Sequence, residues 1–209
     1  MRLELPKLYP ITDARLSGLS HAEQVARLAD GGATFVQLRE KRLSPREFYR
    51  EAEAALHVAR VRGVRLIIND RVDVALALQA DGVHLGQDDL PPEAARRLLG
   101  KSAIIGLSTH NLEQAREAAR QPVDYIAIGP IFLTSSKDNP DPLVGLDGLR
   151  RVHDVIGSVP LVAIGGINSE NARRTLAAGA DALAVLSVLL VEPSLITLRT
   201  QELLNHLES

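Results

Sequence analysis

Positions 161–167 read LVAIGGI, which is four apolar residues followed at once by a glycine pair. A strand with one wet face would alternate apolar and polar residues, so this uninterrupted run indicates a strand that is buried on both faces. The run RLIIND at positions 65–70 has the same character and ends in the polar residues Asn69 and Asp70. Strands of this kind are typical of a parallel sheet that is covered by helices.

The same pattern recurs along the chain. Eight runs are candidate strands: Leu8–Asp13, Phe35–Glu40, Arg65–Asp70, Gly82–Gln87, Ile104–Thr109, Tyr125–Pro130, Leu161–Gly166 and Ala182–Ser187. Segments with helical periodicity lie between and after them: Ser20–Ala29, Ser44–Arg62, Val72–Gln79, Pro92–Leu99, Leu112–Arg120, Leu146–Ile156, Glu170–Ala178 and Pro193–Leu207. This α/β alternation closes most simply into a single (β/α)8 TIM barrel, with residues 1–209 as one domain. The competing doubly wound sheet usually stops at about five or six strands.

Composition narrows the function classes. The formal net charge of −2 argues against a general nucleic-acid-binding protein, which would be basic. The absence of cysteine excludes disulfides and thiolate metal sites. The first ten residues lack the apolar stretch of a signal peptide, and no apolar run is long enough to span a membrane. We therefore expect a cytoplasmic enzyme without a membrane or nucleic-acid partner; a homo-oligomer stays open.

Long polar side chains end the second predicted strand. Gln37, Arg39 and Lys41 alternate along it, so they share one face. Sites in TIM barrels lie at the C-terminal ends of the strands, where these three donors would be costly to bury without an anion. An arginine fork next to a lysine charge suits a pyrophosphate group. The alternative is a solvated strand end whose cations pair with Glu40.

Acidic residues follow the next two strands. Asn69 and Asp70 end the third, and Gln87–Asp89 follow the fourth. Neighbouring strands are about 4.8 Å apart, so carboxylates at their ends can reach one hard cation. Mg²⁺ takes one or two carboxylates together with phosphate oxygens, which makes Asp70 and Asp89 the expected ligands. The alternative is helix capping, a common role for Asp at these positions.

Two later segments suit a second anion. The loop 129–145 carries hydroxyl groups and one lysine, and the fifth strand contributes one more hydroxyl to the same mouth: Thr134, Ser135, Ser136, Lys137 and Ser108. The loop is long enough to act as a lid, although an ordinary surface loop is a serious alternative. Gly165-Gly166 and Leu186-Ser187 follow the last two strands, where TIM barrels often bind phosphate. Two anion sites indicate two phosphorylated substrates, or one substrate phosphorylated at both ends.

We expect structural roles for the histidines and for one tyrosine. Four histidines fall on expected helices or their ends and are expected to face solvent: His21, His57, His153 and His206. His84 and His110 lie on or near strands, but neither has a partner at metal-binding spacing, so a direct role is the less favoured interpretation. Tyr125 is expected in the core.

Taken in their order along the chain, the sequence motifs resemble those of the thiamine monophosphate synthase and thiazole tautomerase superfamily. Within it, they resemble those of the thiamine-phosphate synthases. They run from 9–13 (YPITD) through 37–41 (QLREK), 69–71 (NDR), 82–89 (GVHLGQDD), 129–132 (GPIF) with Thr134 and Lys137, and 164–167 (IGGI), to Ser187. The resemblance implies a transferase. It would join hydroxymethylpyrimidine diphosphate to thiazole phosphate through a pyrimidinylmethyl cation, giving thiamine phosphate and pyrophosphate.

The resemblance also implies residue roles. The pyrimidine diphosphate site would contain Gln37, Leu38, Arg39, Glu40, Lys41, Asn69, Ser108 and Lys137, of which Arg39, Lys41, Ser108 and Lys137 would be catalytic. The thiazole phosphate site would contain Thr134, Ser135, Ser136, Gly166, Leu186 and Ser187. Mg²⁺ would be the cofactor, bound by Asp70 and Asp89.

Some positions depart from the family, and rival functions stay open. Leu133 stands where the family often has Pro, and Ser136 where Thr is common. A thiazole tautomerase shares the motifs at 38–41 and 69–71, but it differs at 87–89 and carries His in place of Pro130. A non-catalytic binder of thiamine precursors would not need a Mg²⁺ site.

Overall fold

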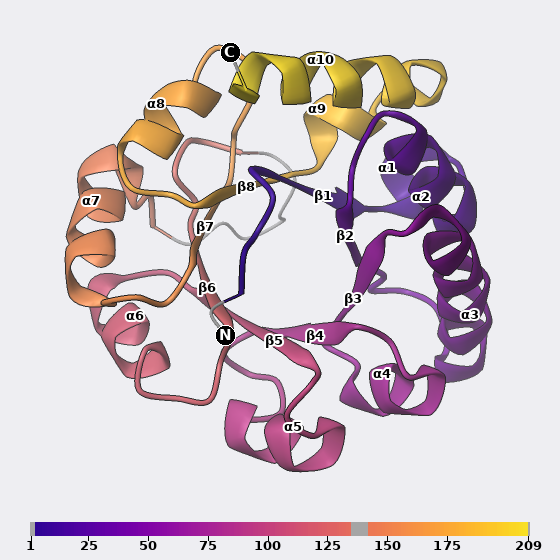
Figure 1. The fold of residues 1–209 in the computed structure, drawn as a ribbon, viewed down its shortest axis with the longest axis horizontal. Helices are drawn as coiled ribbons and strands as arrows, with labels where there is room; N and C mark the ends of the chain where they lie inside the picture. The colour runs from indigo at the N-terminus through magenta and orange to yellow at the C-terminus, as the bar shows by residue number, and fades with distance from the viewer. Residues whose placement is uncertain (1–2, 135–141, 209) are drawn as a thin grey trace.

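Eight parallel strands close into a barrel, and helices form a ring around it (Figure 1). The computed structural model describes residues 3–134 and 142–208. The strands are β1 (Leu8–Thr12), β2 (Phe35–Leu38), β3 (Arg65–Asn69), β4 (Gly82–Leu85), β5 (Ile104–Thr109), β6 (Tyr125–Ile128), β7 (Leu161–Ile164) and β8 (Ala182–Val185). Each strand pairs with the next, and β8 returns to β1 with Leu183 opposite Leu8. The predicted (β/α)8 barrel is confirmed.

The helices follow the predicted order. They are α1 (Ala14–Ser17), α2 (His21–Asp30), α3 (Pro45–Arg62), α4 (Val72–Leu78), α5 (Pro92–Leu99), α6 (Leu112–Ala118), α7 (Gly145–Val155), α8 (Ala172–Ala177), α9 (Ser187–Leu190) and α10 (Ile196–Glu208), with a 3₁₀ turn at Pro193–Leu195. The clearest prediction, α3, begins with a capping box between Ser44 and Glu47 and ends at Gly63, whose φ of 68° is left-handed. Sequence periodicity missed α1 and α9, because a single helical turn has no period to detect.

Strand alternation divides the core into two layers. The inner layer fills the barrel with side chains that include Tyr9, Phe35 and Tyr125. The outer layer lies between the strands and the helices and includes Leu38. Leu3 and Leu5 pack against the inner layer from the chain's N-terminal segment, so the N-terminal end of the barrel is filled. In the described part of the chain, no helix is both long and apolar enough to cross a bilayer.

Candidate active site

A cavity of about 640 Å³ opens at the C-terminal ends of the strands. The predicted site residues that line it are Gln37, Arg39, Lys41, Asn69, Asp70, Asp89, Ser108, Thr134, Gly166, Leu186 and Ser187. They come from the ends of strands on every side of the barrel, which is how TIM barrels assemble sites. The structure therefore brings most of the predicted residues to one place.

Leu38 and Glu40 lie on the other face of the second strand and its extension. Leu38 is fully buried in the outer core layer. The Glu40 carboxylate instead accepts a hydrogen bond from the backbone N–H of Arg42, and it lies 3.5 Å from His21 Nε2. The side chains of both residues are therefore placed to support the strand end rather than to enter the cavity. Ser135, Ser136 and Lys137 lie outside the described residues.

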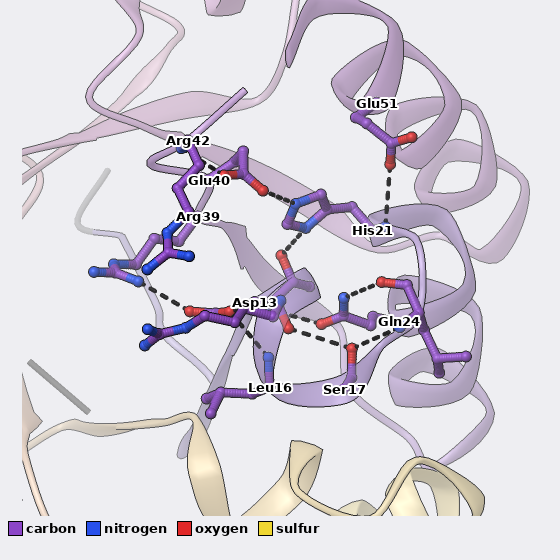
Figure 2. Close-up of polar contacts among 12 residues, drawn as sticks. Asp13, Leu16, Ser17, His21, Gln24, Arg39, Glu40, Arg42 and Glu51 are labelled. Carbon is purple, nitrogen blue, oxygen red and sulfur yellow. Dashed lines mark hydrogen bonds and ion pairs between the residues drawn. The ribbon is translucent and has the colours of Figure 1, made fainter. Parts of the chain in front are cut away.

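Arg39 is held in position by Asp13, the residue that follows β1. Arg39 Nη1 donates to Asp13 Oδ2 at 3.1 Å, and Asp13 Oδ1 accepts from the backbone N–H groups of Arg15 and Leu16 (Figure 2). Asp13 is thus the N-cap of α1 and the anchor of Arg39 at the same time. Its own backbone N–H donates to Gln24 Oε1 on α2, which fixes the carboxylate from behind.

His21 corrects a prediction. It was expected to face solvent at the start of a helix, but at the start of α2 it is fully buried, with Thr12 of β1 and Glu40 after β2 as the partners of its ring. Burial lowers its pKa, against the opposing effect of Glu40. The neutral ring can accept from the Thr12 hydroxyl at Nδ1, 2.7 Å away, and donate from Nε2 toward Glu40 (Figure 2). The other histidines expected on helices behave as predicted, since His57 and His153 are exposed and His206 is partly exposed.

Two carboxylates and one ammonium form the acidic side of the cavity. Lys41 Nζ lies 2.5 Å from Asp70 Oδ2, and Asp89 Oδ2 accepts from the backbone N–H of Gly86 at 2.6 Å. Burial raises the pKa of Asp70; Lys41 opposes this, and the adjacent Asp89 carboxylate adds to it. Among the described residues there is no cluster of three or more His, Cys, Asp or Glu side chains for a metal. A pair of carboxylates at a cavity nonetheless fits Mg²⁺, which keeps waters and takes phosphate oxygens as its other ligands.

The opposite side of the cavity is formed by backbone. Gly165 and Gly166 have φ values of 102° and 63°, which favour glycine. A Cβ on Gly166 would lie 2.5 Å from the Leu133 carbonyl oxygen, so the chain can approach this closely only without a side chain. The Gly166 carbonyl is held by Asn171 Nδ2 at 2.9 Å, and Ser187 is the first residue of α9. Backbone groups in such a loop can bind a phosphate.

The floor of the cavity contains residues that were not among the predicted site residues. His84 and Tyr9 line it, and Tyr125 lies directly beside them with a hydroxyl that is 2.8 Å from each. Burial lowers the pKa of His84 to about 4, so the ring is neutral near pH 7. His110 also lines the cavity, with Nδ1 3.0 Å from the Gly129 carbonyl oxygen.

Comparisons with known proteins identify the family of the chain. The family model described as thiamine monophosphate synthase matches residues 8–189. The thiamine-phosphate synthase of Chloroflexus aurantiacus is 50% identical over 182 residues, 87% of this chain and 83% of that protein. The corresponding protein of Albidiferax ferrireducens is 47% identical over 208 residues, 98% of this chain and 94% of its own length. A solved structure of thiamine phosphate pyrophosphorylase from Pyrococcus furiosus is also similar, with a TM-score of 0.86, 39% identity, and coverage of 97% of this chain and 96% of that one. The chain therefore belongs to the thiamine monophosphate synthase family.

Proposed function

We propose that the chain performs its family's thiamine-phosphate synthase reaction by holding a diphosphate and a monophosphate on opposite sides of one cavity. The substrates would be hydroxymethylpyrimidine diphosphate and thiazole phosphate. The observation that carries this proposal is that different groups lie on the two sides of the cavity mouth. Arg39, Lys41 and two carboxylates lie after β2 to β4, and the Gly165-Gly166 backbone lies after β7.

The side of the cavity that follows β2 to β4 would bind and stabilise the diphosphate. Arg39 is fixed by Asp13, and it offers a planar fork for phosphate oxygens. Lys41 would exchange part of its contact with Asp70 for the anion. Mg²⁺, bound by Asp70 and Asp89, would supply further positive charge to the departing diphosphate. Interactions of this kind accelerate the reaction because they strengthen as negative charge develops on the leaving group.

The glycine side would place the second substrate. Backbone N–H groups near Gly166 and Ser187 would hold the phosphate of the thiazole. Its ring nitrogen would then face the carbon from which the diphosphate departs. Capture of the pyrimidinylmethyl cation by the thiazole nitrogen needs no protein nucleophile, only water exclusion and correct placement. The expected contribution of Lys137 to the diphosphate site stays a prediction.

The test of this function is direct. Purified protein is mixed with both substrates, with and without Mg²⁺, and thiamine phosphate is measured. We expect product only with the metal, and no product with metal present would remove the proposal. Magnesium binding to Asp70→Asn and Asp89→Asn, measured by calorimetry in the presence of pyrophosphate, tests the ligands separately. Asp154→Asn is the control, because this carboxylate is exposed on α7 and does not line the cavity, so its loss should leave binding unchanged.

A further inference from the structure

A continuous chain of hydrogen bonds crosses the interior of the barrel beneath the cavity. Gln37 Nε2 lies 3.1 Å from Tyr9 Oη, and Tyr9 Oη lies 2.8 Å from Tyr125 Oη. Tyr125 Oη is 2.8 Å from His84 Nδ1, and His84 Nε2 is 2.8 Å from Ser108 Oγ. Five residues from five different strands are therefore linked, and both ends, Gln37 and Ser108, line the cavity.

The chemistry of the groups favours one direction for the chain. An amide nitrogen can only donate, so Tyr9 accepts from Gln37, and its single proton can then go to Tyr125 Oη, 2.8 Å away. Tyr125 in turn donates to His84 Nδ1. A neutral imidazole that accepts at one nitrogen carries its proton on the other, so His84 Nε2 donates to Ser108 Oγ. The proton of Ser108 is then left to be donated into the cavity.

We propose that this chain fixes Ser108 as a hydrogen-bond donor to the departing diphosphate, with His84, Tyr125 and Tyr9 as positioning residues. The inference rests on the proposed function, because it takes the pyrimidine diphosphate as the anion at Ser108. Run in the opposite direction, the chain would have Ser108 donate to His84. It would then turn an oxygen lone pair toward an anionic oxygen.

The direction matters most as the leaving group separates. Ionised diphosphate oxygens accept hydrogen bonds and donate none, and their charge grows while the bond to carbon breaks. A donor that is already oriented gains strength at that moment without reorganisation. The chain is shielded from competing water, since Tyr9, Tyr125 and His84 are 1%, 0% and 6% exposed. Hydrogen bonds in series also polarise one another in such an environment.

The tautomer of His84 tests the direction without an activity measurement. Nitrogen-15 NMR of the histidine-labelled protein distinguishes a proton on Nε2 from one on Nδ1, and His84→Gln identifies the signals. We expect the neutral Nε2–H form in the free protein. A proton on Nδ1 would reverse the chain and overturn the inference.

Kinetics test whether the chain acts through Ser108. Tyr125→Phe should lower kcat about ten-fold, the effect of about one hydrogen bond, with little change in the KM of thiazole phosphate. Tyr49→Phe is the matched control, since that hydroxyl donates to Glu53 on the exposed face of α3. In a Ser108→Ala background, Tyr125→Phe should have no further effect on kcat, whereas independent, additive losses would overturn the inference.

The two proposals can fail separately. If the wild-type protein formed no thiamine phosphate, the proposed function would be removed and the diphosphate role of Ser108 with it. The NMR result would still decide the direction of the chain. If product formed normally but His84 carried its proton on Nδ1, only the further inference would be wrong.

Discussion

A methyl group on Gly106 would press directly on the central tyrosine of the barrel. A Cβ at this position on β5 would lie 2.0 Å from Tyr125 Cζ and 2.4 Å from its Oη. Ordinary carbon contacts are about 3.5 Å, so the ring would have to move by about 1.5 Å. The Tyr125 hydroxyl makes its hydrogen bonds at 2.8 Å to Tyr9 and to His84, and a shift of that size takes it out of reach of at least one partner.

The expected cost of Gly106→Ala has two parts. Overpacking a core costs about 1–3 kcal/mol, and a lost buried hydrogen bond costs about 1–3 kcal/mol more. The ring has little room to relax, because Tyr9 and Phe35 pack edge-on around it, with centroids 5.9 Å and 6.4 Å away. We therefore expect Tm to fall by about 4–24 °C, since each kcal/mol lowers Tm by about 2–4 °C in a domain of this size. We also expect kcat to fall about ten-fold, as in Tyr125→Phe.

Thermal unfolding and the thiamine phosphate assay measure both effects, and a double-mutant cycle identifies their cause. Tyr125→Leu removes the ring atoms that the new methyl would meet, so adding Gly106→Ala to it should cost little further stability. Activity should stay low in the double variant, because leucine restores no hydroxyl. A Gly106→Ala protein with the Tm and kcat of wild type would refute the reasoning. So would an equal loss of stability in both backgrounds.

Three further predictions follow from the cavity rim and its support. Asp13→Asn should lower the free energy of unfolding in urea by only about 1 kcal/mol, because asparagine caps α1 as well as aspartate does. Asp13→Ala removes both the cap and the partner of Arg39, so it should cost about 2–3 kcal/mol. Equal losses in the two variants would contradict the double role of Asp13. Gly166→Ala should raise the KM of thiazole phosphate about ten-fold or more, since the Cβ would meet the Leu133 carbonyl oxygen. Gly157→Ala, with a similar φ of 67° and nothing within 4 Å of its Cβ, should lose stability without that change in KM. The folded-state pKa of His21 is lowered, so its contribution to stability is complete above about pH 6.5 and is lost as pH falls further. The free energy of unfolding should thus change less between about pH 7 and about pH 5 in His21→Gln than in wild type, with His57→Gln as the exposed control.

The fold was predictable because local patterns sufficed. Runs such as 65–70 and 161–167 are apolar on both faces, and strands of that kind need a covered parallel sheet. Strand alternation also placed Gln37, Arg39 and Lys41 on one face, and the structure puts all three at the cavity. The pattern gives the position of these side chains, and their chemistry suggests what they bind.

The supporting residues were not predictable in the same way. His21 begins a helix, a position that usually faces water, and only its contacts with Thr12 and Glu40 explain its burial. Tyr9 and Tyr125 are 116 positions apart, so nothing local indicates that their hydroxyls meet. Strand alternation could have placed both in the barrel interior, since Tyr9 shares a face with Ile11, and Tyr125 with Ala127.

Polar or charged residues at strand ends and polar residues inside the barrel form two groups, which differ in how much the residue type reveals about its role. A charged side chain at a strand end signals an anion, because burial without a partner would be costly. A tyrosine or histidine inside a barrel is equally consistent with packing and with a hydrogen-bond chain, and distances alone separate them. Here four consecutive contacts of 2.8–3.1 Å do so. Gln37 belongs to both groups: its position on β2 was predicted, yet its amide nitrogen points down to Tyr9. The orientation of that amide therefore couples the floor of the barrel to its mouth.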